Sequence, residues 1–389
     1  MKKAIKEALK KVYFSYLKKK RIKENRKIDL KERKKLSRHE IVKQRDKRAK
    51  NIYEKVILTK EQEAQIDALF EKHYGEKIPY TWHRRYTAYT GKFDANYFPE
   101  LLHIPEFEYF MCPIREYSKA FSDKNILPLF AEKAGVKMPK TIVSCTAGEY
   151  RDTDYNVISK EQAVNYLKNQ KFFIKPSVNG GSGAGCRLCK GNEDINKLLD
   201  EMGKDFVAQE VLKCNETITK IYSGSVNTFR VNTFRWKGEI KHLPVIMRIG
   251  QGGNYLDNAH AGGMFIAVDN DGTLHDTAFT EFLDSFKAHP DSGLVFDGYK
   301  IEGLEKVISA AKAVHEQIPQ IGSVHWDFTI DETGAPVLIE ANISFGSIWI
   351  MLMSHGCGAF GDLTPEILEW VKKMKETPVE ERYLHSFGE

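Results

Sequence analysis

A glycine-rich loop in the middle of the chain has the composition of a phosphate-binding flap. An apolar run over residues 171–176 carries Lys175, and the loop after it contains Gly180, Gly181, Ser182, Gly183 and Gly185. Backbone N–H groups that lack side chains can approach anionic oxygens closely, while a lysine adds positive charge and a serine adds a hydroxyl. The run matches neither the P-loop nor the dinucleotide-binding glycine pattern. It predicts a different kind of phosphate site, with a plain flexible hairpin as the alternative.

Two carboxylates near the C-terminus are expected to face each other across a pair of strands. Residues 323–342 have the pattern of two strands around a turn. If the turn closes with Asp331 opposite Pro336, then Asp327 lies opposite Glu340. The pattern therefore predicts that both carboxylates meet on one face of the hairpin.

The same hairpin predicts a site for a divalent cation. Asn342 shares the face of Glu340, because side chains on a strand alternate between its two faces. Carboxylates that face each other on an apolar sheet repel unless a cation lies between them, and hard oxygen ligands favour Mg²⁺. Asp327, Glu340 and Asn342 are thus the predicted metal ligands. The alternative is that one carboxylate simply points to solvent.

The elements that must position these residues alternate in type after residue 123. The predicted helices are residues 124–134, 192–202 and 302–316. The predicted strands are residues 140–144, 171–176 and 205–211, followed by β-rich stretches near 226–235, 239–249 and 263–268 and by the hairpin at 323–342. This order is typical of an α+β fold with antiparallel strands.

Charge is distributed unevenly along the chain. The first fifty residues hold 22 Lys and Arg against 6 Asp and Glu, a net charge of +16, whereas all 389 residues together carry only +6. The remaining residues therefore carry −10, which excludes a globally basic nucleic-acid coat. A basic extension on an acidic body is the expected arrangement.

The N-terminal segment is predicted to form a basic amphipathic helix. Within residues 1–25, apolar side chains recur at steps of three and four at Ile5, Leu9, Val12, Tyr13, Tyr16 and Leu17. Two interpretations stay open: the stripe adheres to an anionic membrane surface or a partner helix, or it packs on the body of the same chain. Residues 26–50 are expected to be a helical or partly disordered connector, and residues 58–72 a helix with Thr59 as its N-cap.

Aromatic residues are concentrated between Trp82 and Phe110. We expect them to pack under irregular loops, and the alternative is an exposed acceptor-binding surface beside His83, Arg84 and Arg85. No stretch is apolar enough to span a membrane, and the six scattered cysteines do not form a disulfide framework pattern. A cytoplasmic protein is expected, peripheral at the inner face of the membrane if the basic helix binds lipid.

Further motifs flank the loop and the hairpin in a consistent order. They are Asp123-Lys124 ahead of Gly135-Val-Lys-Met-Pro139, the strand-like run 206–212, and Arg248 ahead of Asn258 and His260-Ala-Gly-Gly263. In this order they resemble the ATP-grasp superfamily over about residues 120–375. The resemblance implies ATP as cofactor with Mg²⁺, or Mn²⁺ in its place. It also implies that the nucleotide is bound by Lys124, Lys175, Gln209, Glu210, Val211 and Leu212.

The segment 82–97 and the run Asp123-Lys124-Asn125 are more narrowly similar to the sugar-transfer-associated ATP-grasp group, which occurs at loci for capsule and cell-surface polysaccharides. The implied organisation is a basic helical extension followed by an aromatic-rich region and two α+β subdomains that clasp ATP. The expected boundaries are 1–57, 58–122, 123–205 with the glycine flap, and 206–389 with the hinge and the metal site.

The resemblance implies an ADP-forming carboxylate–amine ligase that acts through an acyl phosphate in polysaccharide biosynthesis or modification. Its partners would be a small carboxylate and an amine or sugar, a membrane or glycosyltransferase through residues 1–25, and no nucleic acid. Arg230 and Arg248 would grip phosphate, because a guanidinium binds two oxygens at once, and Asn258 and His260 would orient substrate. The alternatives are a kinase of a sugar or lipid-linked hydroxyl, and a nucleotide-binding scaffold of a glycan-assembly complex.

Overall fold

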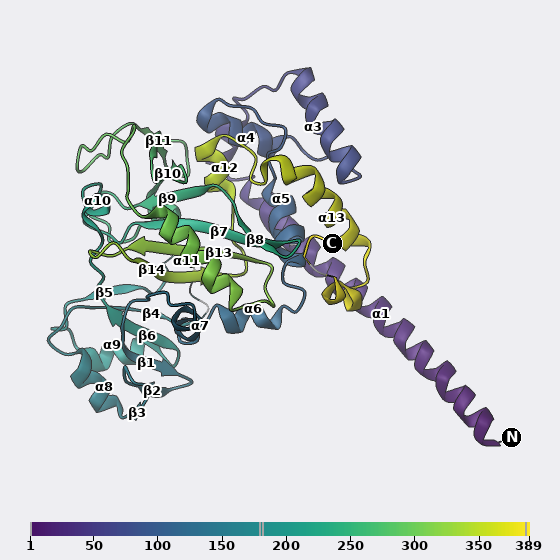
Figure 1. Ribbon diagram of the computed structural model, residues 1–389, viewed down its shortest axis with the longest axis horizontal. Coiled ribbons are helices and arrows are strands. Elements are labelled where there is room, and N and C mark those ends of the chain that lie inside the picture. Colours follow the sequence, from purple (N-terminus) through teal and green to yellow (C-terminus); the bar gives the residue numbers. More distant parts are fainter. Residues whose placement is uncertain (1, 179, 181–182, 386) are drawn as a thin grey trace.

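Two antiparallel sheets form the centre of the fold (Figure 1). A computed structural model describes residues 2–178, 180, 183–385 and 387–389. The smaller sheet has six strands in the order β3-β2-β1-β6-β4-β5, and the larger has eight, in the order β12-β11-β10-β9-β7-β13-β14 with β8 paired to β7. Helices and antiparallel strands share the chain, so the predicted α+β class is confirmed.

The smaller sheet is covered on one face by two helices. Its strands are β1 (Thr141–Thr146), β2 (Glu149–Arg151), β3 (Val157–Ile158), β4 (Phe172–Pro176), β5 (Arg187–Cys189) and β6 (Phe206–Glu210). Leu167 of α8 (Lys160–Leu167) and Leu199 of α9 (Ile195–Met202) pack against Phe172 in one apolar cluster. Because β6 pairs with both β1 and β4, this sheet continues past the boundary expected at residue 205.

The larger sheet is covered on both faces. Its strands are β7 (Thr228–Trp236), β8 (Glu239–His242), β9 (Val245–Ile249), β10 (Met264–Val268), β11 (Leu274–Phe279), β12 (Ser285–Phe286), β13 (Ser323–Ile330) and β14 (Pro336–Asn342). Every residue of β13 is buried, because this strand lies between β7 and β14 and under α11 (Leu304–Glu316) on one face. The short helices before this sheet and beside it are α6 (Glu116–Phe121), α7 (Leu127–Lys133), α10 (Glu216–Thr219) and the 3-10 turn η2 (Ala259–Ala261).

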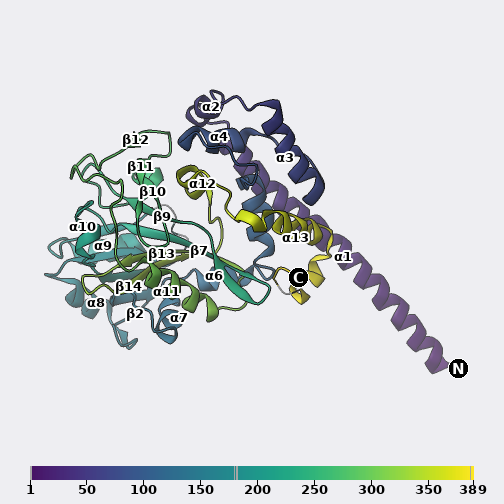
Figure 2. The ribbon, with the colours of Figure 1, turned by 45° about the horizontal axis from the view of Figure 1, so that its top comes forward.

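Helices from both ends of the chain cover the second face of the larger sheet (Figure 2). The N-terminal ones are α2 (Lys47–Tyr53), α3 (Lys60–His73), α4 (Thr81–Thr90), α5 (Glu100–Leu102) and the π-helical turn η1 (His103–Glu108). The C-terminal ones are α12 (Trp349–His355), η3 (Gly361–Leu363), α13 (Thr364–Glu376) and η4 (Val379–Leu384). The predicted N-cap of α3 is confirmed, since Thr59 and Gln62 form a capping box.

The aromatic stretch is part of this core. Trp82, Tyr86, Tyr97 and Phe98 are at most 3% exposed, so the alternative of an exposed acceptor-binding surface is wrong. The expectation of irregular loops is wrong for α4, which is a regular helix ended by Gly91 at φ 73°. Bulky rings at helical spacing provide enough apolar area to anchor α4 on the sheet, because aromatic side chains dominate the energetics of core packing.

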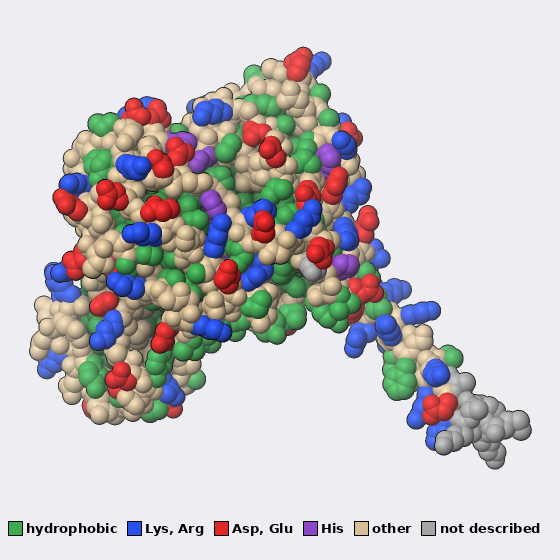
Figure 3. All heavy atoms as spheres, viewed as in Figure 1, with side chains coloured by type: hydrophobic (Ala, Val, Ile, Leu, Met, Phe, Trp, Pro, Cys, Tyr) green, Lys and Arg blue, Asp and Glu red, His purple; other side chains and the backbone are tan. Residues whose placement is uncertain are grey.

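The first helix, α1 (Lys2–Lys43), leaves the body for much of its length (Figures 1 and 3). Leu9, Val12, Tyr13 and Tyr16 are 59–68% exposed, so these residues of the predicted stripe do not pack on the body of the same chain. The connector predicted after residue 25 is helical and continues α1 to Lys43. None of the described helices has the length and apolar composition that crossing a membrane requires.

Candidate active site

A cavity of about 1790 Å³ lies between the two sheets. Figure 1 shows the smaller sheet below β14, and residues from β4 and β6 line the cavity opposite residues from β7, β9, β13 and β14. The predicted site residues on its wall are Lys124, Lys175, Gly180, Gly183, Gln209, Glu210, Val211, Leu212, Arg230, Arg248, Asn258, His260, Asp327, Glu340 and Asn342. Gly181 and Ser182 lie outside the described residues.

The C-terminal hairpin brings its two carboxylates face to face by a route that the pattern did not predict. Pro336 pairs with Ile330, so the predicted pairing with Asp331 is wrong by one residue. A β-bulge next to Asp327 then shifts the register by one, and Asp327 pairs with Glu340 as expected. The bulge therefore restores the juxtaposition that the turn alone would have lost.

Asp327 is the centre of a buried polar cluster. Arg230 donates to its two oxygens at 2.5 and 3.1 Å, Arg248 forms an ion pair with Oδ2 at 3.0 Å, and the amide of Asn342 donates to Oδ2 at 3.3 Å. Burial by itself would raise the pKa of Asp327, but the two guanidinium groups outweigh burial and hold that pKa below its usual range. The carboxylate therefore stays ionised.

A second pair lies beside this cluster. Lys124 forms an ion pair with Glu340 at 3.0 Å, and Lys175 donates to the carbonyl of Ile339 at 3.4 Å. Burial, and secondarily the nearby Lys124 ammonium, lowers the pKa of Lys175 to about 8, although Glu340 opposes the change. Two lysines from the smaller-sheet side thus converge on the hairpin of the larger sheet.

Arg248 has two further partners that the sequence analysis did not identify. Its guanidinium donates to the hydroxyl of Thr228 at 2.7 Å and lies 3.6 Å from Asp257, and the Thr228 hydroxyl donates to Asp257 at 2.5 Å. Burial raises the pKa of Asp257, while Arg248 opposes the change. In the sequence, Asp257 directly precedes the predicted Asn258, and this adjacency could have drawn attention to it.

The glycine flap, with Gly180 and Gly183, and the hinge, residues 209–212, line the cavity on the side of the smaller sheet. Gly183 has φ 78°, and a Cβ there would lie 2.9 Å from the end of the Leu256 side chain of the opposite loop, so this position favours glycine. The Tyr255 hydroxyl also donates across to the carbonyl of Cys186 at 3.2 Å. In the hinge, the Gln209 amide donates to the carbonyl of Pro139, and Glu210 accepts from the N–H of residue 140.

Asn258 and His260 lie at the rim of the cavity. The Asn258 side chain accepts a hydrogen bond from the N–H of His260 and so caps η2. The imidazole Nδ1 of His260 is 2.7 Å from a carboxylate oxygen of Glu281, and the imidazole ring packs against the ring of Trp349 in a tilted arrangement. These hydrogen bonds therefore stabilise the rim. Both residues also line the cavity, and their role in orienting the substrate stays a prediction.

The oxygen donors at the hairpin suit a hard cation that arrives together with an anion. Within the described ranges, no group of three His, Cys, Asp or Glu side chains is arranged to hold a metal. Asp327 already accepts three hydrogen bonds and forms an ion pair with Arg248, whereas Glu340 has a side chain 29% exposed and, among the described residues, pairs only with Lys124. The surrounding lysines and arginines outnumber the carboxylates, so a bare cation would be repelled. A divalent cation bound to a polyphosphate fits this site.

The loop after β14 lines the cavity and is held from behind by two buried carboxylates. Glu108 of η1 accepts hydrogen bonds from the N–H groups of residues 345–346 at 2.9 and 2.7 Å. Glu100 of α5 accepts from the N–H groups of residues 348–349 at 2.6 and 2.7 Å. Burial raises the pKa of each carboxyl to about 8. The sequence analysis missed both, because their partners lie more than two hundred residues away.

Replacing Glu108 with glutamine should weaken the pH dependence of stability. The folded pKa of about 8 lies above the ordinary value of 4.5, so the folded state binds more protons between these values. The free energy of unfolding therefore falls as the pH rises from about 4.5 to 8, and E108Q removes the share due to this carboxyl. Urea unfolding across this range measures the slope. The exposed control E149Q should leave the slope unchanged, and an unchanged slope in E108Q would contradict the prediction.

A family profile and several solved structures are similar to this chain. The sequence profile of a family described as sugar-transfer associated ATP-grasp matches residues 106–366. An N5-carboxyaminoimidazole ribonucleotide synthetase solved with ADP is similar at 14% identity and a TM-score of 0.35, over 57% of this chain and 44% of its own. No curated protein sequence gives a significant match.

Two other solved structures are similar at the same level. An L-amino acid ligase from Bacillus licheniformis has 14% identity and a TM-score of 0.38, over 67% of this chain and 50% of its own. A D-alanine–D-alanine ligase from Bacillus anthracis has 14% identity and a TM-score of 0.38, over 66% of this chain and 68% of its own. This chain therefore spans about half the length of the synthetase and of the amino acid ligase.

The assignment to a family rests on the sequence profile alone. Structural similarities with TM-scores of this size do not contribute to it. The matched residues include every strand of both sheets and most of the cavity wall. The family predicted from the motifs is thereby confirmed, together with the ATP-grasp fold. The chain belongs to the sugar-transfer associated ATP-grasp family.

Proposed function

We propose that this protein is an ATP- and Mg²⁺-dependent carboxylate–amine ligase that forms ADP and acts in cell-surface polysaccharide biosynthesis or modification. The observation that carries the proposal is the charged cluster on the cavity wall, which consists of Lys124, Lys175, Arg230, Arg248, Asp327 and Glu340. Four cations at one point suit a triphosphate and the charge that develops during phosphoryl transfer. The sugar-transfer description of the family supports the polysaccharide context.

The proposed reaction has two steps that require no protein nucleophile. A carboxylate oxygen of the substrate attacks the γ-phosphorus of ATP, the bond from that phosphorus to the bridging oxygen breaks, and ADP leaves. The amine nitrogen then attacks the acyl carbon, the carbon–oxygen bond to phosphate breaks, and inorganic phosphate leaves while the amine gives up a proton. Each step is mainly a matter of positioning the reactants and neutralising charge.

The residues of the chain divide this work. Lys124 and Lys175 would neutralise the phosphates, while Arg230 and Arg248, fixed by Asp327, would hold the transferred phosphoryl group through their remaining N–H groups. The adenine would lie against the hinge at residues 209–212, which lines the cavity. Asp327, Glu340 and Asn342 would hold Mg²⁺, which when bound neutralises phosphate charge.

Product analysis tests the proposal. The full chain is incubated with ATP and Mg²⁺ against amino acids and uronic-acid sugars as carboxylates, each paired with an amine, and product masses are determined. ADP, inorganic phosphate and an amide in equal amounts support the ligase. ADP with a phosphorylated hydroxyl compound would show the kinase instead, and the absence of ADP release with every pair would favour the nucleotide-binding scaffold.

ATP binding should be accompanied by proton uptake near pH 8. Lys175 has a pKa of about 8 in the free protein, and bound phosphates would raise it because an adjacent anion favours the ammonium form. Affinity should therefore fall as the pH rises above about 8, where the free lysine becomes neutral. Titration calorimetry at this pH in two buffers with different ionisation enthalpies measures the protons taken up.

The matched control is Lys175→Arg, whose guanidinium stays charged throughout this pH range. In this variant the binding enthalpy should become independent of the buffer while ATP still binds. Equal enthalpies in both buffers for the unmodified protein would contradict the assignment of Lys175 to the phosphate site.

A further inference from the structure

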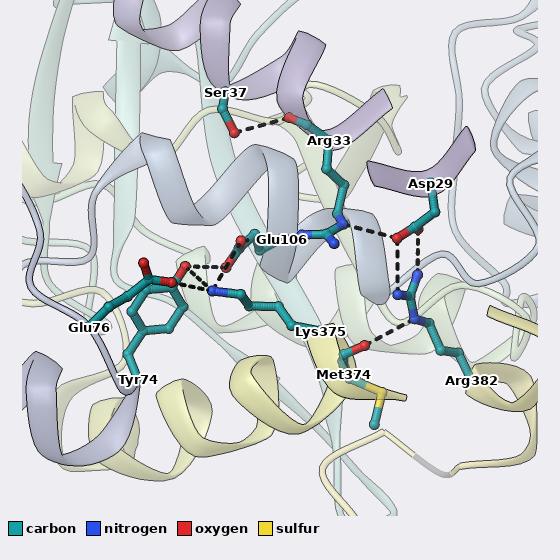
Figure 4. Close-up of polar contacts among 9 residues, drawn as sticks. All are labelled: Asp29, Arg33, Ser37, Tyr74, Glu76, Glu106, Met374, Lys375 and Arg382. Atoms are coloured by element: carbon teal, nitrogen blue, oxygen red, sulfur yellow. Dashed lines mark hydrogen bonds and ion pairs between the residues drawn. The ribbon is translucent and has the colours of Figure 1, made fainter. Parts of the chain in front are cut away.

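The second half of α1 is fixed to the body by buried ion pairs. Asp29, which is 4% exposed, receives two hydrogen bonds from Arg382 of η4 at 2.5 and 3.1 Å (Figure 4). One turn later, Arg33 pairs with Asp29 at 3.2 Å and with Glu106 of η1 at 3.4 Å. Charge pairs that are desolvated and bound on several sides hold their elements in one orientation. The direction in which the first half of α1 leaves the body is thus set by the fold.

That first half carries an apolar stripe exposed to solvent. Leu9, Val12, Tyr13 and Tyr16 follow the i, i+3, i+4, i+7 spacing of one helix face, and their side chains are 59–68% exposed. In Figures 1 and 2 this part of α1 extends alone, away from both sheets. Large apolar side chains grouped on one exposed face mark an interaction surface, because burying them in water-free surroundings is strongly favourable.

The charge of the same segment identifies what covers the stripe. Residues 2–24 contain ten Lys and Arg against two Glu. Lys6, Lys10, Lys11 and Lys18–Lys20 are exposed around the stripe, and Figure 3 shows the blue side chains along the projecting helix. Two copies of such a helix repel each other, so a second copy of this chain is a poor occupant. Anionic lipid headgroups attract the lysines, while the acyl region accepts the aromatic and aliphatic stripe.

We propose that residues 2–24 of α1 dock the protein onto an anionic lipid bilayer, with Leu9, Val12, Tyr13 and Tyr16 embedded at the boundary of headgroups and acyl chains. The helix lies in the interface and does not cross it, which agrees with the finding that no described helix is suited to span a membrane. Docking requires both parts of the surface. The stripe supplies apolar burial and the lysines supply attraction that salt weakens.

Vesicle sedimentation of the full chain tests this proposal without any measurement of turnover, so its failure would leave the proposed ligase activity standing. The protein should sediment with vesicles of phosphatidylserine and phosphatidylcholine, remain in solution with phosphatidylcholine alone, and be released by high salt. The double variant L9Q/Y16Q keeps every charge and should lower the partition coefficient at least about tenfold, because two large apolar side chains no longer enter the bilayer.

The matched control is V157Q/V295Q, which removes two valines of similar exposure, 61% and 59%, from the body. This control should sediment like the unmodified protein, and circular dichroism should show unchanged helix content in both variants. Equal sedimentation of L9Q/Y16Q and the control would overturn the proposal. Light scattering provides a second measurement: a dimer that L9Q/Y16Q converts to monomers, without lipid binding by the unmodified chain, would identify a second copy as the occupant and also overturn it.

Discussion

Replacing Glu340 with glutamine should lower turnover by at least about a hundredfold while leaving the fold intact. Glutamine keeps the size of the side chain and can still accept a hydrogen bond from Lys124, but it removes the negative charge that the metal would need. Because the two side chains have nearly the same size, the substitution leaves no cavity at this position, which is 29% exposed. Steady-state rates of ADP formation and a thermal melt of the same sample measure both effects.

The matched control for this substitution is Glu332→Gln in the turn of the same hairpin, where the side chain is 63% exposed. This control should retain normal turnover, because the residue lies outside the cavity wall. Near-normal turnover in E340Q would remove Glu340 from the site and with it the proposed metal position. Loss of turnover in both variants would instead indicate damage to the hairpin.

Replacing Asp327 with alanine should destabilise the fold by about 3–5 kcal/mol, because it removes the carboxylate that pairs with two largely buried guanidinium groups and leaves Arg248 with the more distant Asp257, at 3.6 Å. Arg230 and Arg248 are 12% and 10% exposed in their side chains, and each bonds to Asp327. Asparagine at the same position can still accept hydrogen bonds and should cost less. The free energy of unfolding from urea titration measures these losses.

An exposed ion pair provides the comparison for this variant. Asp200, whose side chain is 70% exposed, pairs with Lys160 at 2.6 Å, and Asp200→Ala should leave the urea midpoint nearly unchanged because exposed pairs contribute little. A small loss in D327A would mean that the arginines find other partners or water. The two carboxylates of the candidate site are thus expected to differ, Glu340 acting mainly on turnover and Asp327 acting on stability as well.

The hairpin shows how far local pattern carries a prediction. Facing strands and a turn are visible in the sequence, but the bulge beside Asp327 is not, because Phe328, Leu338 and Ile339 are all apolar and fit either register. The predicted meeting of Asp327 and Glu340 was correct although the predicted turn was wrong by one residue. The stretch 239–249, predicted as β-rich, holds β8 and β9, which run in the same direction along β7, and the register against β7 shifts by one residue between them.

Some features that the sequence analysis did not find have a local signal, and others depend on tertiary contacts. The helices α8, α12 and α13 were not predicted, although α8 begins with a capping box at Ser159 and Gln162 that was available as a local signal. Glu100 and Glu108 acquire their role only when the N-terminal helices pack behind the loop after β14. Such residues carry no local pattern, since buried carboxylates and exposed ones look alike in a sequence.

The uninterrupted course of α1 also sets a distance. Asn25, Ile28, Asp29 and Glu32 of this helix line the cavity, while Tyr16 belongs to the exposed stripe. Between Tyr16 and Ile28 a helix rises about 18 Å, and no break occurs in this part of α1. The helix is therefore a rigid spacer: any support on which Tyr16 rests is held a constant length from the mouth of the cavity, and an acceptor tethered to that support must be long enough to bridge the gap.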